Sequence, residues 1–206
     1  MKHIIKGDEP QSFTIWKALQ NDDWQPTYDN LSGQEKKDVK DALIQEQGTI
    51  CCYCETKLTY NDSHIEHLVP QSNNEEGRLD FANMLCSCQQ QLERGEPLHC
   101  GNSKGDDIIS ITPLILDCES KFTYTEDGYI GYIDTASKQT IKHLQLDIDK
   151  LNKLRKNAIN SVMYHDPIEQ DTFLTEEEIK IFVEGYLKKK DGSYNEFYTT
   201  IKYLFG

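Results

Sequence analysis

No stretch of this sequence approaches the ~20 consecutive apolar residues that a membrane-spanning helix requires. The most apolar run, residues 108–116, is interrupted by a serine, a threonine and a proline. Residues 1–8 contain no apolar core long enough for a secretory signal. We therefore expect a cytoplasmic protein that makes no contact with a membrane.

Basic residues are also scarce. The chain carries 22 Lys and Arg against 35 Asp and Glu, a formal net charge of −13. Residues 51–106, where most cysteines lie, hold four basic and nine acidic side chains. A protein that grips nucleic acid alone usually has a basic face. Either a nucleic-acid substrate is delivered by a partner that supplies positive charge, or the chain does not act on nucleic acid.

Several catalytic motifs are missing. The chain has no G-x-x-x-x-G-K-[ST] string, so any ATP hydrolysis must come from another protein, and no H-E-x-x-H string of a metalloprotease. His64 and Glu66 match the H-x-E of zinc deaminases, which also need P-C-x-x-C. Here only one residue separates Cys86 from Cys88, and Leu85 rather than a proline precedes them, which argues against a deaminase.

Seven cysteines are present, and six of them lie between residues 51 and 100. An odd number without an export signal argues against a disulfide framework. Cys51 and Cys54 form a C-x-x-C pair, whose spacing lets one tight turn aim two thiolates at a tetrahedral ion. We expect Cys88 and Cys100 to complete a structural zinc site, with the long loop between them bulging outward.

Two further cysteines, Cys52 and Cys86, remain alternative zinc ligands. The competing interpretation is that the cysteines are small buried apolar side chains. Their clustering in a polar segment with a sparse hydrophobic core favours metal, because a bound ion would supply the missing folding energy.

The chain divides into three segments by composition. Residues 1–48 are predicted to be helical, residues 49–106 carry the cysteines and the chemistry, and residues 107–206 are predicted to be mainly helical with a small hairpin. The last segment has no catalytic motif, so we expect it to dock a partner. The predicted fold class is α+β, mainly helical.

Local patterns predict individual elements. Ser32 is a plausible N-cap for a helix over residues 34–47 that Gly48 ends. A Glu-Asp-Gly turn lies between residues 122–125 and 129–133, and this pattern predicts a hairpin. Thr175 and Glu178 fit a capping box, and a final helix follows. A long helix is predicted over residues 138–163, with these core positions: Ile141, Leu144, Leu151, Leu154, Ile159 and Val162.

Four short strings occur in a fixed order in the middle segment. They are Cys51-x-x-Cys54, Glu66-His67-Leu68-x-Pro70, Asn83-x-Leu85-x-x-Cys88 and Cys100-x-Asn102-x-Lys104-Gly105. Together they resemble the HNH endonuclease family, whose nuclease core is a zinc-supported ββα-metal fold. The wider layout is similar to the PtuB branch, the nuclease of the Septu antiphage system and of related retron systems.

The resemblance implies a role for each matching residue. His67 would be the general base, and Asn83 would orient His67 or its loop by a hydrogen bond. Glu66 and Asn102 would be oxygen ligands of a catalytic Mg²⁺, which suits such ligands. Lys104 would contact phosphate. We expect the neighbouring His64 to lie beside the site or at the surface.

The PtuB resemblance also implies a partner, an ABC-type ATPase similar to PtuA, and a role as effector of an antiphage complex. We expect DNA as the substrate. Two alternatives stay open: an RNA- or tRNA-cutting retron effector that uses the same site, and a non-catalytic zinc module that binds a partner. Zinc without metal-dependent cleavage would favour the latter.

Overall fold

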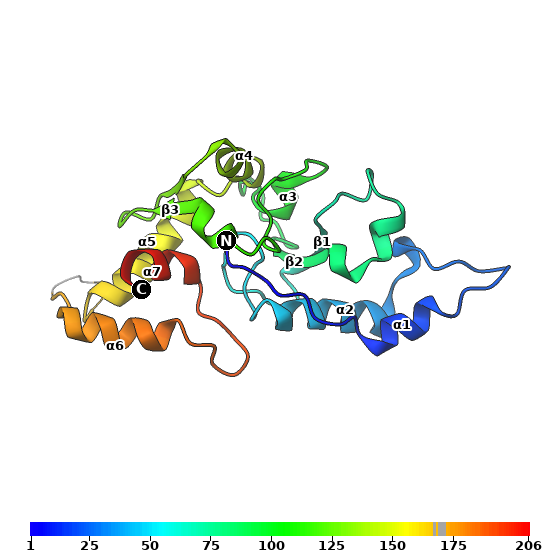
Figure 1. The fold of residues 1–206 in the computed structure, drawn as a ribbon, viewed down its shortest axis with the longest axis horizontal. Helices are drawn as coiled ribbons and strands as arrows, with labels where there is room; N and C mark the ends of the chain where they lie inside the picture. Colours follow the sequence, from blue (N-terminus) through cyan, green and yellow to red (C-terminus); the bar gives the residue numbers. More distant parts are fainter. Residues whose placement is uncertain (167, 169–171) are drawn as a thin grey trace.

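A computed structural model describes residues 1–166, 168 and 172–206. Over these residues the chain forms seven α-helices, four short 3₁₀ turns and two two-stranded antiparallel sheets. Figure 1 shows α1 and α2 at one end of the molecule and α6 and α7 at the other. The predicted α+β class with a helical majority is confirmed. In the described part of the chain, no helix has both the length and the apolar character to cross a membrane.

The N-terminal helices are α1 (Gln11–Lys17) and α2 (Gly33–Glu46). Helix α2 matches its predicted bounds to within one residue and buries Val39 and Leu43. Ser32 is its N-cap residue, although its side chain makes no capping bond. Gly48 follows at φ +68°, and a Cβ there would lie 2.3 Å from the Tyr194 ring, so the helix stop also admits a close contact.

The central sheet pairs β1 (Ser63–His67) with β2 (Met84–Cys88), and Glu66 lies opposite Leu85. Between the strands, the chain makes two 3₁₀ turns, Glu76–Leu79 and Phe81–Asn83. A short helix, α3 (Gly101–Lys104), follows β2 after a long excursion. Two strands and a helix therefore follow one another in chain order around the predicted site.

The second sheet is the predicted hairpin. Strand β3 (Phe122–Tyr124) pairs with β4 (Ile130–Tyr132), and the turn contains Gly128 at φ +85°. A Cβ on Gly128 would lie 2.3 Å from a backbone oxygen of Asn152, so the turn packs directly on the next helix. The hairpin prediction is confirmed.

The predicted helix over residues 138–163 is wrong in one respect, because it is two helices. They are α4 (Thr135–Leu144) and α5 (Asp149–Met163). Gln145 adopts the left-handed conformation at φ +48° and ends α4, which lets Leu144 and Leu146 both be fully buried. Of the predicted core positions, Leu154 is wrong, since it is 36% exposed on the outer face of α5.

The C-terminal helices are α6 (Glu176–Tyr186) and α7 (Tyr198–Phe205). The predicted capping box of α6 is confirmed: the Thr175 hydroxyl accepts from the Glu178 backbone N–H, and the Glu178 carboxylate accepts from the Thr175 N–H. Val183 of α6 and Ile201 of α7 join Ile159 and Val162 of α5 in a small separate core.

The main core combines side chains from all three predicted segments, from Met1 to Leu151. The Met1 ammonium is fully buried and lies 2.7 Å from the Glu55 carboxylate. It also donates to the hydroxyls of Tyr124 on β3 and Thr199 on α7. The boundaries at residues 48 and 106 stay a prediction.

Candidate active site and metal centre

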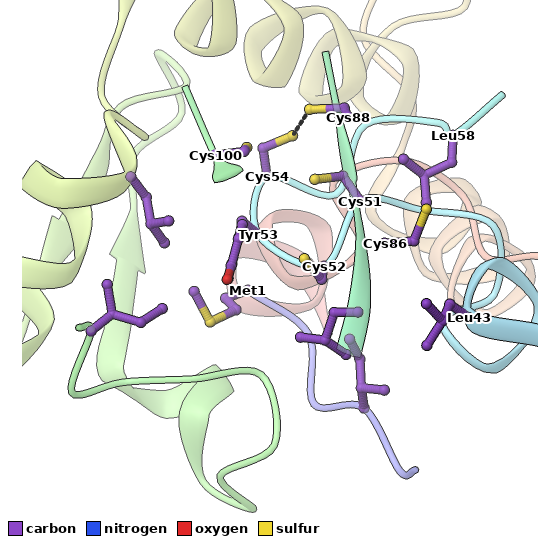
Figure 2. Packing of buried hydrophobic residues seen from close by; sticks show 14 of the residues in the cluster. Met1, Leu43, Cys51, Cys52, Tyr53, Cys54, Leu58, Cys86, Cys88 and Cys100 are labelled. Atoms are coloured by element: carbon purple, nitrogen blue, oxygen red, sulfur yellow. Dashed lines mark hydrogen bonds between the residues drawn. The ribbon is translucent and has the colours of Figure 1, made fainter. Parts of the chain in front are cut away.

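Four buried cysteines converge on one point behind the sheet. The sulfur atoms of Cys51, Cys54, Cys88 and Cys100 all lie within 4.8 Å of one another, and Figure 2 shows them gathered between the Cys51–Cys54 turn and β2. The Sγ atoms of Cys54 and Cys88 are 3.7 Å apart. Sulfurs bound to one tetrahedral zinc at ~2.3 Å would be about 3.8 Å apart, so the cluster fits structural zinc.

The electrostatics of the cluster also favour a cation. Burial raises the pKa of the Cys100 thiol well above its usual range, and the neighbouring thiols of Cys51, Cys54 and Cys88 raise it further. A buried thiolate beside other thiolates is costly unless a positive charge compensates it. A divalent ion supplies that charge and makes four thiolates compatible with burial.

Cys52 and Cys86, the alternative ligands, are not in this group. Both are buried, and burial raises the pKa of the Cys86 thiol to about 12. In Figure 2 the Cys86 sulfur points away from the four converging thiols. These two side chains pack as small apolar groups in the core.

The excursion between Cys88 and Cys100 projects outward as predicted, and residues 90–98 are exposed or half-buried. Gln89 fastens its base: its side chain accepts from the His99 N–H and donates to the Pro97 carbonyl. His99 is 2% exposed and its Nδ1 lies 3.1 Å from the Cys100 sulfur. Both ends of the excursion are therefore fixed beside the cysteine cluster.

Glu66 is a buried acid near the end of β1, on the face toward α3. Its Oε1 accepts from the Tyr53 hydroxyl at 3.0 Å and lies 3.0 Å from the Lys104 ammonium. Burial and the charge of Glu66 raise the pKa of the Tyr53 phenol well above its usual range, so the phenol keeps its proton and donates it. Tyr53 was not foreseen as a site residue, because nothing in its spacing marks it.

His67 follows Glu66 and, like successive side chains on a strand, points to the other side. Its Nε2 lies 3.0 Å from the Arg78 carbonyl, which can only accept, so Nε2 carries the proton and Nδ1 is free to accept one. The Gln71 amide lies 3.3 Å from Nδ1, and Tyr28 packs edge-on against the ring. Burial lowers the pKa of His67, which keeps the ring neutral near pH 7.

Asn83 is buried, with 8% of its surface exposed, and it contacts the loop that follows β1. Its amide oxygen accepts from the Val69 N–H, and its amide nitrogen donates to the carbonyls of Val69 and Gly77. Gly77 precedes Arg78, the residue that holds the His67 ring. Asn83 therefore contacts the loop that orients His67 rather than the imidazole itself.

A shallow cavity of about 230 Å³ opens beside Glu66 and His67, lined also by Gly101, Lys104 and Asp106. Asn102 does not line it. Its amide nitrogen donates to the Gln89 carbonyl at 2.6 Å, so the side chain is turned toward the base of the excursion. The ligand role of Asn102 remains a prediction.

Lys104 lines the cavity and is 2% exposed. Its ammonium pairs with Glu66 and donates to the carbonyls of His67 and Gly105. In this arrangement Lys104 neutralises Glu66 from inside the fold instead of projecting into solvent. Its contact with phosphate stays a prediction.

Comparison with known proteins gives the family. No family model matches the chain. It is 34% identical over 139 residues to the "Retron Vc95 putative HNH endonuclease" of Vibrio cholerae serotype O1 biovar El Tor, an alignment that spans 63% of this chain and 67% of the relative. The chain belongs to the HNH endonuclease family.

A second relative of this HNH chain is the "Retron Ec83 putative HNH endonuclease" of Escherichia coli, 28% identical over 135 residues. That alignment covers 62% of this chain and about half, 48%, of the relative. Both relatives are named putative HNH endonucleases, which agrees with the HNH resemblance seen in the sequence, and both names refer to retrons. The finer assignment to the PtuB branch is not tested by these similarities.

Proposed function

We propose that this HNH protein hydrolyses phosphodiester bonds in nucleic acid, with DNA as the first substrate to test. One observation carries the proposal: the Arg78 carbonyl fixes the proton of His67 on Nε2 and leaves Nδ1 as a base at the edge of a cavity that also holds Glu66. A base with an oriented ring beside a buried carboxylate suits the activation of water against a phosphodiester.

In this proposal His67 accepts the proton of the attacking water at Nδ1. The Arg78 carbonyl stabilises the imidazolium that forms, because the Nε2–H bond strengthens when the ring becomes positive. Gln71 lies within reach of Nδ1 and must yield its place to the water. Asn83 is a positioning residue, since it acts on the ring through the loop from Val69 to Arg78.

Glu66 would hold the catalytic divalent cation, for which Mg²⁺ is the first ion to test. When bound, such an ion polarises the scissile phosphate and stabilises the leaving oxygen. Tyr53 and Lys104 fix the carboxylate through one oxygen, so its orientation is set before substrate binds.

The zinc centre is proposed as the scaffold of a ββα-metal core. The four cysteines come from the turn before β1, the end of β2 and the residue before α3. One ion at this point would tie the strands to α3 and hold Gly101 and Lys104 beside Glu66.

The setting of the reaction is proposed from the retron names of the relatives and from charge. A net charge of −13 leaves nucleic acid to be delivered by a basic partner, for which we propose an ABC-type ATPase in an antiphage complex. The C-terminal region is the proposed docking surface, and α6 exposes Ile181 and Phe182 there. An Ile181→Glu substitution should abolish co-purification with the ATPase; unchanged co-purification would contradict this surface.

The deciding experiment is cleavage of plasmid DNA in Mg²⁺ by the zinc-loaded chain, alone and with the ATPase encoded beside it. His67→Ala should lower the rate by ~10²–10⁴-fold, the usual contribution of a general base. His3→Ala, which changes a half-buried histidine outside the proposed docking region, is the matched control and should leave the rate unchanged.

If plasmid DNA is not cleaved, RNA and tRNA are the next substrates to test. If RNA or tRNA is cut and DNA is not, the same site serves an RNA-cutting effector. If neither polymer is cut while zinc is present and the protein is folded, the nuclease proposal is wrong and a non-catalytic zinc module remains.

A further inference from the structure

His64 lies two residues before Glu66 on β1, so both side chains are on the strand face that meets α3. The His64 Nε2 and the Glu66 Oε2 are 3.8 Å apart. This separation is too long for a direct hydrogen bond. It suits two atoms that bind one cation at about 2.0–2.2 Å each, which can be at most ~4.4 Å apart.

The two oxygens of Glu66 have different surroundings. Oε1 already has two donors, the Tyr53 hydroxyl and the Lys104 ammonium. Oε2 faces His64 and Gly101. The oxygen available to a cation is therefore the one beside the His64 imidazole.

Gly101 explains why the space between these atoms is open to the backbone of α3. A Cβ on Gly101 would lie 2.5 Å from Glu66 Oε2 and 2.7 Å from His64 Nε2. Any side chain at position 101 would therefore fill the space between the Glu66 oxygen and the His64 nitrogen. The first residue of α3 thus carries no side chain at the one point that faces both of them.

We propose that His64, through Nε2, is the second protein ligand of the catalytic cation, together with Glu66 Oε2. The inference rests on the proposed nuclease function. It assigns to a strand residue the role that the sequence pattern gave to Asn102, whose amide is bound to the Gln89 carbonyl at the base of the excursion.

An imidazole ligand changes the expected metal preference. Carboxylate and amide oxygens suit Mg²⁺, whereas imidazole suits later transition metals. With one carboxylate and one imidazole, the site should bind Co²⁺ or Ni²⁺ more tightly than Mg²⁺. Asn102 in place of His64 would leave an all-oxygen site in which this preference is weaker.

The test is pulsed electron paramagnetic resonance of Mn²⁺ added to the full-length, zinc-loaded chain. Imidazole nitrogen bound to Mn²⁺ gives a ¹⁴N modulation, which does not depend on catalysis. The modulation should be present in the wild type and in Asn102→Ala, and absent in His64→Ala. His165→Ala is the matched control and should keep it, and zinc content should be equal in all four proteins.

A second variant guards against a simple packing defect at His64. His64→Gln keeps a polar side chain of similar size that can bind a cation only through its amide oxygen, so it should retain Mn²⁺ binding and lose the ¹⁴N modulation. The proposal is overturned if the modulation persists in His64→Ala, or if it is lost in His67→Ala instead. Mn²⁺ that binds without any ¹⁴N modulation overturns the His64 assignment alone, whereas a wild type that binds no Mn²⁺ also overturns the cation site of the proposed function.

Discussion

His64, Glu66 and His67 lie within four residues of one strand; His64 and Glu66 share one face, and His67 points to the other side. Glu66 faces Tyr53 and Lys104, while His67 faces the loop that ends at Arg78. The chemistry of each group is set by its nearest partner more than by its residue type. Removing the hydrogen-bond partner of one of these side chains should therefore change its chemistry.

Asn83→Ala should slow cleavage by about tenfold or more, although Asn83 does not touch the His67 ring. The change removes three hydrogen bonds from the loop, two of them with Val69, and leaves the buried carbonyl of Gly77 unpaired, at a cost of about 1–3 kcal/mol for that group. Asn73→Ala, an exposed position in the same loop, is the matched control. Cleavage rates and urea unfolding of both variants check this; an active Asn83→Ala protein would contradict the positioning role.

At this scale the sequence predicted part of the site. The order Glu66, His67, Asn83 and the four cysteines was readable because each belongs to a recognisable string. Tyr53, Gln71 and the Arg78 carbonyl were not, since side-chain contacts between irregular segments, here 4, 11 and 13 positions apart, have no sequence signal. The direction in which Asn102 points also depends on Gln89, which only the fold reveals.

Among the elements, β2 ends at one residue of the cysteine cluster, Cys88, and α3 begins directly after another, Cys100. Helix α3 has four residues, too few to be stable without tertiary support. Cys54→Ser should lower the zinc content to below one ion per chain and lower the melting temperature by several degrees, because the metal contributes folding energy. Cys86→Ser, a buried cysteine outside the cluster, is the matched control and should retain zinc in elemental analysis.

Thr175→Ala should destabilise α6 by about 1 kcal/mol through the loss of its capping box. Thr175→Ser keeps the hydroxyl and should be close to neutral. Urea unfolding followed by circular dichroism gives both values. Equal stability of the two variants would show that the cap contributes nothing in this context.

Element boundaries were predictable where a local signal exists. The capping box of α6, the stop at Gly48 and the Glu-Asp-Gly turn each fix an end by local backbone chemistry. The break between α4 and α5 has no such signal, because Gln145 is an ordinary helix residue whose left-handed conformation is imposed by the burial of Leu144 and Leu146.

Across the whole molecule, the Met1 ammonium joins distant parts: the Glu55 carboxylate, Tyr124 on β3 and Thr199 on α7. Burial alone would lower its pKa, but the charge of Glu55 and the bonds to Glu55 and Tyr124 outweigh burial and raise the pKa from 8.0 to about 11.

This raised pKa predicts a loss of stability in alkali. The ammonium stabilises the fold fully below pH 8, and its contribution falls as the pH rises from 8 to about 11. The free energy of unfolding should drop by on the order of 2–4 kcal/mol over that range. Glu55→Gln should be less stable at pH 7 and flatter between pH 8 and 11 in denaturant titrations. Parallel curves for the two proteins would contradict the assignment.

The excursion between Cys88 and Cys100 has a consequence for engineering. Gln89 closes its base with hydrogen bonds to His99 and Pro97. The length of the segment between residues 90 and 96 should therefore have little effect on the geometry of the cysteine cluster. Since lengthening a closed loop costs little entropy, about 0.6 kcal/mol for each doubling, the tip near Gly95 can accept a peptide tag or a whole reporter domain. An insertion near Gly95 should therefore leave the cysteine cluster and its zinc content unchanged.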